Sequence, residues 1–232
     1  MPYLLYQHEI ARTLELVGLI GAQPPSWQPS FAVLEQDRVE AAAVLPDLRA
    51  PYAVLHPGAS EESRHWPADR FVQVGNALAA QGWQIVVTGV EYEHALVERI
   101  AAELEHPAIP AVGRLSIGGL AALLKDAALV VSNDTGPMHL TNAVGTPNVA
   151  IFWCGNYMNW AHFNRRGHRP LRSWTVICPL CGADMTPDEK PDTGCDHNAC
   201  FVDGVTVEQV LTEAFDLLAY HAALPASAAN RT

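Results

Sequence analysis

The segment LVVSNDTGPMHLTNAVGTPNVAIFW, Leu129–Trp153, contains the pattern that decides the fold. Its two apolar runs, Leu129–Ser132 and Asn148–Trp153, have the length and the β-branched content of buried strands. Between them, Pro137 can occupy the first turn of a helix, where its missing N–H costs nothing. A strand, a helix and a second strand in this order are the repeating unit of a parallel α/β sheet.

The same alternation runs through most of the chain from Pro51 onward. Strands are predicted at 52–56, 83–89 and 109–113, and helices at 68–82, 91–105, 116–127 and 206–224. This order predicts a mostly parallel sheet with helices on both faces. Ligands of such sheets bind beyond the carboxyl ends of the strands. The loops of interest therefore follow His56, Thr88, Val112 and Ser132.

Three segments fall outside this pattern. Residues 1–50 are a linker-like segment with one helix near Glu9–Leu19 and a Pro-rich connection, too little for a second α/β domain. Residues 154–204, rich in Gly, Pro, Asp and Cys, read as a loop-like Cys-rich flap within the main domain of residues 51–224. Residues 225–232 are predicted to form a frayed tail.

Composition limits the class of protein. The 232 residues are 49% hydrophobic and 17% charged, as in soluble globular domains. The net charge of −11 argues against nucleic acid or an anionic membrane surface as partner, although a small anion can still bind at a helix N-terminus. We expect a cytoplasmic protein, because neither a signal peptide nor a transmembrane run of about 18 apolar residues is evident.

The segment after Ser132 has the features of an anion site. Asp134 or Thr135 can cap the following helix, and Gly136 lets a ligand approach the backbone. Free N–H groups and the helix dipole favour a negative charge at this end. His139 lies close enough to the helix start to point at such an anion. The alternative is an ordinary helix start with a surface histidine.

Two other strand-end loops offer polar side chains. In His56–Pro67, Arg64 can supply a positive charge to a phosphate and Ser60 a hydroxyl, unless the segment is only a surface loop before a helix. In Thr88–His94, the Glu91 carboxylate can accept two hydrogen bonds from a ribose diol. The alternative is that Glu91 interacts only with the dipole of its own helix.

The flap holds closely spaced cysteines. Cys178 and Cys181 are followed by Cys195 and Cys200, and these four can hold one tetrahedral zinc ion. Two disulfides or free thiols are the alternatives. Zinc here would be structural, because four protein ligands leave no open position. Cys154, at a strand end, reads as a packed thiol.

Taken together, these stretches resemble glycosyltransferase family 9, the ADP-heptose:lipopolysaccharide heptosyltransferases. The matching pieces are LHPGASEESRHWP, VVTGVEYE, GRLSIGGLAALLKDAALVVSNDTGPMHLTNAVGTPNVAIF and the C-P-L-C…C-D-H-N-A-C segment, in the family's order. The resemblance implies a Rossmann-like doubly wound sheet equivalent to the C-terminal, donor-binding half of a GT-B glycosyltransferase. It also implies transfer from an ADP-sugar, with ADP-heptose as the expected donor and no cofactor required.

The resemblance also implies a role for each matching residue. Asp134, Thr135, Gly136 and His139 would hold the diphosphate and sugar of the donor. Ser60 and Arg64 would contact the phosphates, Glu91 would bind the ribose, and Leu115 would lie near the adenine.

The chain departs from the family pattern in two ways. The family usually has Lys where this chain has Arg64, a change that keeps the charge but alters the hydrogen-bonding geometry. No counterpart of the acceptor-binding N-terminal domain, which carries the expected general base, is recognised in the sequence. We therefore expect donor binding with little transfer by this chain alone. The alternative is a non-catalytic nucleotide-sugar-binding or partner module that a separate N-terminal half completes or that self-associates.

Overall fold

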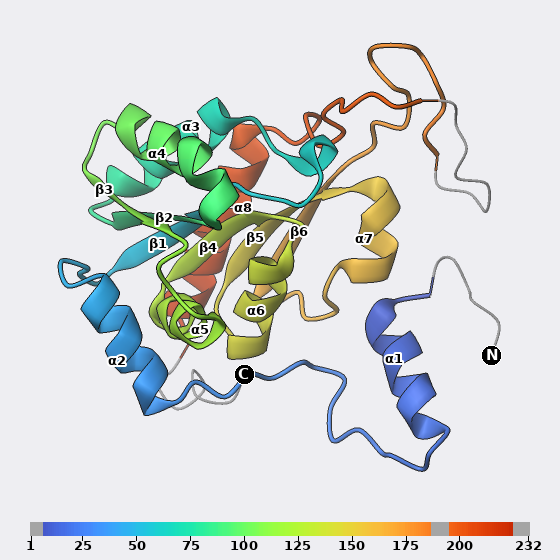
Figure 1. Cartoon of the computed structure of the whole chain (residues 1–232), viewed down its shortest axis with the longest axis horizontal. Coiled ribbons are helices and arrows are strands. Elements are labelled where there is room, and N and C mark those ends of the chain that lie inside the picture. The colour runs from blue at the N-terminus through green and yellow to red at the C-terminus, as the bar shows by residue number, and fades with distance from the viewer. Residues whose placement is uncertain (1–6, 187–194, 225–232) are drawn as a thin grey trace.

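The computed structural model describes residues 7–186 and 195–224 of the chain. Its centre is a six-stranded sheet in which every pairing is parallel and the strand order is β3-β2-β1-β4-β5-β6 (Figure 1). The strands are β1 (Tyr52–His56), β2 (Gln84–Gly89), β3 (Ala108–Val112), β4 (Leu129–Asn133), β5 (Asn148–Trp153) and β6 (His168–Ser173). The predicted doubly wound α/β fold is confirmed, and its order is that of a Rossmann sheet.

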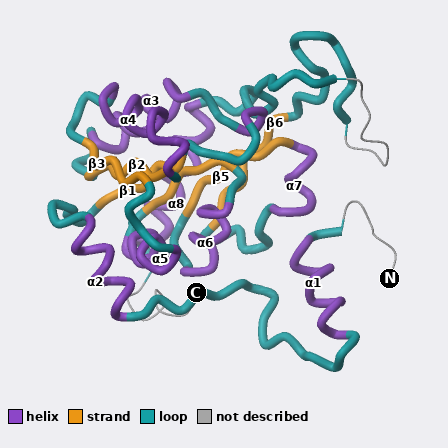
Figure 2. Tube along the Cα trace, viewed as in Figure 1, coloured by secondary structure: helices purple, strands orange, loops and turns teal. Residues whose placement is uncertain are grey.

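Helices cover both faces of the sheet (Figure 2). One face packs against α3 (Ala68–Ala79), α4 (His94–Glu103) and α8 (Val207–Ala222), and the other against α2 (Glu35–Val44), α5 (Ile117–Asp126) and α6 (Gly136–Val144). Strand β1 shows why both faces need a cover. Leu55 lies in the first core, whereas Val54, one residue earlier, lies in the second, because successive side chains of a strand point to opposite faces.

Three elements of the structure were not predicted. Helix α2 was missed because half of its residues are polar and its one buried residue is Asp37, which accepts a hydrogen bond from the Leu34 amide at 2.8 Å. The prediction of a loop-like flap was wrong in its first part, which contains α7 (Cys154–Trp160) and β6. Strand β6 includes Pro170, and proline is tolerated there because β6 is the edge strand of the sheet.

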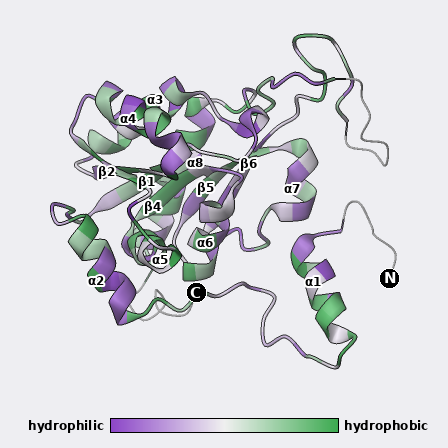
Figure 3. Cartoon of the chain, viewed as in Figure 1, coloured by the Kyte–Doolittle hydropathy of each residue, from purple (hydrophilic) through white to green (hydrophobic). Residues whose placement is uncertain are grey.

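Helix α1 (Glu9–Gly18) stands apart from the layers around the sheet (Figure 1). None of its residues is buried, and both hydrophobic and hydrophilic residues lie along it (Figure 3). Just before α1, His8 Nε2 lies 2.8 Å from the backbone oxygen of Ala161. In the described ranges, no helix combines the length and the hydropathy needed to cross a bilayer.

The strand order indicates where a ligand is expected to bind. The chain winds outward from β1 through β2 to β3, then returns to the other side of β1 with β4. The connections leave the sheet in opposite directions at this point, so the loops after β1 and β4 diverge at the carboxyl edge. Doubly wound proteins bind their ligands in the crevice between such loops.

Candidate functional site

Asn133, the last residue of β4, attaches the loop that follows β1 to the end of β4. Its Nδ2 donates to the Pro57 oxygen at 2.7 Å, and its Oδ1 accepts from the Trp66 amide at 3.2 Å. The side chain is fully buried, so its amide holds both ends of the loop that follows β1. Sequence reasoning missed Asn133, and the available signal was a polar residue at the end of an otherwise apolar strand.

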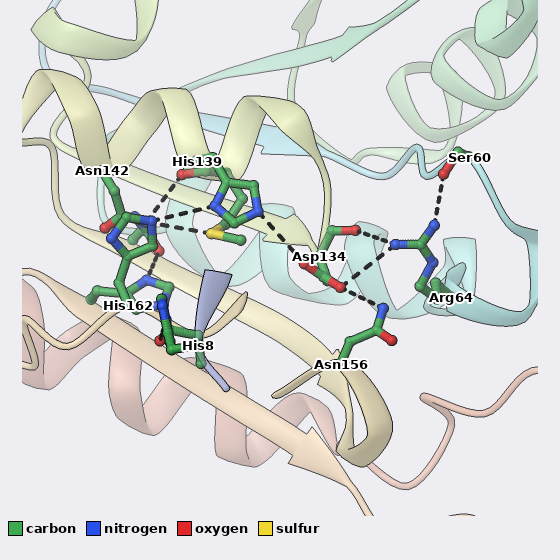
Figure 4. A network of polar contacts seen from close by, with 12 residues as sticks. His8, Ser60, Arg64, Asp134, His139, Asn142, Asn156 and His162 are labelled. Atoms are coloured by element: carbon green, nitrogen blue, oxygen red, sulfur yellow. Dashed lines mark hydrogen bonds and ion pairs between the residues drawn. The ribbon is translucent and has the colours of Figure 1, made fainter. Parts of the chain in front are cut away.

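Ser60, Arg64 and Asp134 come together between the loop after β1 and the loop after β4 (Figure 4). Arg64 Nη1 lies 3.6 Å from Asp134 Oδ2 and donates to the Asp134 backbone oxygen at 3.4 Å. Arg64 Nη2 donates to Ser60 Oγ at 2.7 Å. The Asp134 side chain is almost entirely buried, whereas Arg64 keeps part of its guanidinium in solvent. A partly solvated guanidinium at the carboxyl edge of the sheet is suited to binding a phosphate.

Asn156 is a second residue that sequence reasoning missed. It lies on α7, in the segment that was predicted to be loop-like, and its Nδ2 donates to Asp134 Oδ2 at 2.8 Å. Asp134 thus has Arg64 and Asn156 on one carboxylate oxygen and His139 facing the other (Figure 4). This carboxylate organises the side chains around it.

The start of α6 is open to a ligand. Thr135 occupies the N-cap position, but its side chain makes no capping hydrogen bond, and Pro137 lies in the first turn as predicted. Gly136 is exposed, and a Cβ placed on it would meet nothing within 4 Å. The first N–H groups of a helix have no partner within the helix and form its positive end. This end of α6 can therefore receive an anion beside Arg64.

His139 lies one turn into α6 and faces Asp134. Its Nε2 is 4.0 Å from Asp134 Oδ1, and its Nδ1 is 3.3 Å from Nε2 of His162. Burial lowers the pKa of His139, and the opposite effect of the Asp134 charge only partly compensates. His139 is accordingly neutral at neutral pH, which suits a hydrogen-bonding ligand better than a fixed positive charge.

Glu91 and Leu115 lie at the ends of β2 and β3, on the outer side of β1. Glu91 is exposed and begins the short 3-10 turn η2 (Glu91–Glu93). A Cβ on Gly113, which has a φ of +57°, would lie 2.6 Å from Glu91 Oε2, so this carboxylate rests against the loop after β3. Leu115, in the same loop, packs on the core under α5. Among the described residues, no hydrogen bond or ion pair links Glu91 to Asp134, so the predicted residues form two neighbouring groups.

The flap brings together three of the four predicted metal ligands. The ligand atoms of Cys178, Cys181, Cys195 and His197 all lie within 4.8 Å of one another. Cys181 Sγ is 3.5 Å from Cys195 Sγ, which is too far for a disulfide bond, and all five cysteines are free. Although burial favours the neutral thiol, backbone N–H groups of Cys181 and Leu180 help lower the pKa of Cys178 to about 7. A thiolate is the form that binds metals.

The prediction of Cys200 as a metal ligand was wrong. Its thiol donates to the backbone oxygen of His65 at 3.2 Å, outside the cluster. The next residue, Phe201, donates from its amide to the Ser63 oxygen at 2.8 Å. These contacts attach the chain at Cys200 to the loop after β1, and His197 takes the fourth position in the cluster.

Comparisons with known proteins identify a family. The family description "Glycosyltransferase family 9 (heptosyltransferase)" matches residues 2–168. Lipopolysaccharide heptosyltransferase 1 of Escherichia coli K12 is 29% identical over 148 residues, which cover 63% of this chain and 44% of that protein. The chain therefore spans about half the length of the curated relatives that it matches.

Solved structures share the fold. The glycosyl transferase family 9 protein of Veillonella parvula superposes with a TM-score of 0.74 at 22% identity, over 92% of this chain and 60% of that one. E. coli heptosyltransferase WaaC with ADP superposes with a TM-score of 0.58 at 24% identity, over 94% of this chain and 58% of that one. With its family match over most of its length and its Rossmann-like sheet, the chain belongs to glycosyltransferase family 9, the heptosyltransferase family.

Proposed function

We propose that this chain binds an ADP-sugar, with ADP-heptose as the expected donor, for glycosyl transfer in lipopolysaccharide core synthesis. The observation that carries the proposal is the group of Arg64, Ser60 and the open start of α6 around one point at the carboxyl edge of the sheet. The donor diphosphate occupies that point. WaaC, a structural neighbour, has been solved with ADP.

The two groups of residues suggest where each part of the donor lies. Glu91 accepts hydrogen bonds from the ribose, and the adenine lies near Leu115 beside the ends of β2 and β3. Asp134, Thr135, Gly136 and His139 surround the diphosphate and the sugar. Cleavage of the glycosidic bond leaves negative charge on ADP, and Arg64 together with the helix N-terminus stabilises that charge without a cofactor.

Calorimetric titration with ADP and with ADP-heptose tests the proposal. We expect Arg64→Ala to weaken ADP binding about tenfold or more, because a hydrogen bond to a charged group contributes about 1.5–3 kcal/mol. Arg99→Ala on α4 is the matched control, since Arg99 is exposed and pairs with Glu103 at the surface. Absence of binding by the wild-type chain, or equal affinities for both variants, would overturn the proposal.

We further propose that another protein segment or subunit supplies the acceptor site and the general base. The support is an apolar surface on and after α1, where Leu16, Leu19 and Ile20 are 61%, 72% and 84% exposed. Exposed apolar residues gathered on one element mark an interaction surface. An N-terminal half, rather than a second copy of this chain, is the proposed occupant. Light scattering after size exclusion distinguishes them, because a stable homodimer would contradict this assignment.

We also propose that Cys178, Cys181, Cys195 and His197 hold one structural zinc ion. Three sulfurs and one imidazole nitrogen are a common tetrahedral zinc set and leave no position for a substrate. Elemental analysis of protein purified under reducing conditions should give about one zinc per chain. Cys181→Ser should lower that content, and Cys154→Ser, a cysteine outside the cluster, should not. A metal-free chain would contradict the site, and full occupancy by iron would contradict the assignment of zinc.

A further inference from the structure

His162 is a buried side chain next to His139 of the candidate donor site (Figure 4). It follows α7, belongs to the segment that was predicted to be loop-like, and is only 5% exposed. Its Nε2 lies 3.3 Å from Nδ1 of His139. No other side chain of the described residues makes a hydrogen bond with the His139 ring.

His162 is neutral under ordinary conditions. Burial, followed by the neighbouring His139, lowers its pKa to about 4. The ring of His168 lies 5.4 Å away and is itself buried against Asn148, so the neighbour on this side of His162 is an imidazole rather than a carboxylate. A neutral imidazole carries one N–H, so the hydrogen bond between His139 and His162 holds one proton, which either ring can supply.

Asp134 decides which nitrogen carries that proton. His139 Nε2 faces Asp134 Oδ1 at 4.0 Å, on the side of the ring where α6 begins. A lone pair on this nitrogen would face a carboxylate and any bound anion, whereas an N–H would be attracted to both. Neutral His139 then carries its proton on Nε2, and its Nδ1 must accept. The proton in the contact consequently belongs to Nε2 of His162.

We propose that His162 is a positioning residue, which donates to Nδ1 of His139 and so holds that ring as the tautomer with its Nε2–H directed at the anion site. The hydrogen bond at one nitrogen of a histidine commonly sets the state of the other. That the anion is a nucleoside diphosphate rests on the function proposed above. The tautomer of His139 is a property of the free protein and does not depend on that function.

The charged groups around His139 make the effect depend on pH. Asp134 faces the ring from the loop before α6, Arg64 pairs with that carboxylate, His8 approaches from the segment before α1, and Trp160 packs edge-on at 5.7 Å. When His139 takes up a second proton, both nitrogens carry hydrogen and the tautomer no longer matters. His162 should therefore contribute to ligand binding at high pH and contribute less as His139 becomes protonated.

Two variants and one spectrum test this inference. His162→Gln keeps an N–H donor near the position of Nε2, and His162→Leu removes it. At about pH 8 we expect His162→Leu to bind ADP about three- to tenfold more weakly than His162→Gln, in line with the loss of one hydrogen bond. The ratio of the two dissociation constants should fall towards one as the pH is lowered through the titration of His139. A ratio that does not change with pH would overturn the positioning role.

The second readout needs neither ligand nor variant. Nitrogen-15 NMR of the wild-type imidazoles distinguishes the two neutral tautomers, and we expect His139 to carry its proton on Nε2. A proton on Nδ1 of His139 would overturn the inference even if ADP binds. If ADP does not bind but His139 is the Nε2–H tautomer, the function proposed above fails and the positioning role of His162 stands.

Discussion

Buried histidines make the stability of this protein sensitive to acid. Burial lowers the pKa of His56 to about 4, with a further contribution from His65, and it lowers the pKa of His162 to about 4 as well. The unfolded chain, whose histidines titrate near 6.5, binds more protons than the folded one between those values. The free energy of unfolding must therefore fall as the pH drops from about 6.5 to about 4.

The size of the acid effect can be measured. A pKa difference of one unit corresponds to about 1.4 kcal/mol, so each of the two histidines can cost about 3 kcal/mol by pH 4. Urea denaturation at several pH values should show this decline, and His162→Gln should reduce its slope. The exposed His94 provides the matched control variant, His94→Gln. A free energy of unfolding that is constant between pH 7 and 5 would contradict the prediction.

Asn133 provides a second prediction at the scale of the residue. Asn133→Ala leaves the Trp66 amide and the Pro57 oxygen without their buried partner. Each unsatisfied buried group costs about 1–3 kcal/mol, so we expect a large loss in the free energy of unfolding and weaker ADP binding. Asn76→Ala removes one hydrogen bond, from the exposed Glu105 amide, and should cost less than about 1 kcal/mol. Equal losses for the two variants would contradict the assigned role of Asn133.

The elements that the sequence predicted share a property that the missed elements lack. Strands β1, β4 and β5 are continuous apolar runs because both faces of the sheet are covered, and such runs are visible in the sequence. Strand β6 lies at the edge, alternates buried and less buried residues and contains a proline. Helices α2 and α7 bury little apolar surface, so their periodicity is weak.

The site residues that the sequence predicted also differ in kind from those that it missed. Ser60, Arg64 and His139 lie on strand-end loops or at a helix start, and general rules for parallel sheets point to those places. Asn156 and His162 act through contacts between segments that are 22 and 23 residues apart and belong to a part of the chain without a clear pattern. Only the folded structure shows those contacts.

Residues 199–201 of the flap are attached to the loop after β1, so we expect a change in the flap to alter that loop. Cys178, Ala199 and Phe201 form a small buried cluster with Trp153, and the Phe201 amide binds the Ser63 oxygen next to Arg64. Removing a metal from the cysteines should loosen Phe201 and, through it, the loop that carries Ser60 and Arg64. We expect a chelator to speed hydrogen exchange in both segments and to raise the dissociation constant of ADP severalfold.

Two parts of the chain serve as references in that experiment. Helix α4 packs with Val97 and Ile100 in the first core, far along the sequence from the flap, and its exchange should not change. The Cys181→Ser variant, which lacks one ligand, should show fast exchange with or without chelator. Unchanged exchange at 60–66 after metal removal would show that the flap and the loop are independent.

At the scale of the whole molecule, the two titratable side chains at the start of α6, Asp134 and His139, are both engaged with neighbouring groups. The Asp134 carboxylate is held by Arg64 and Asn156, and His139 is directed at that carboxylate. A general base must reach the acceptor hydroxyl and be free to take its proton. Neither residue meets this requirement while it holds the donor. On the other side of the crevice, the described residues form no second sheet that could carry an acceptor site.

Purified chain should therefore bind ADP without transferring heptose to a lipid A–core acceptor. A coupled assay for released ADP, with the intact E. coli heptosyltransferase as positive control, measures transfer. Calorimetry on the same preparation shows whether the donor site is folded.

Addition of a separately produced N-terminal half should create turnover if that half docks on the exposed surface of α1. Leu16→Glu should then abolish the gain in turnover without changing the affinity for ADP. Transfer by the chain alone would show that a base is present within it and would contradict the division of labour proposed for this molecule.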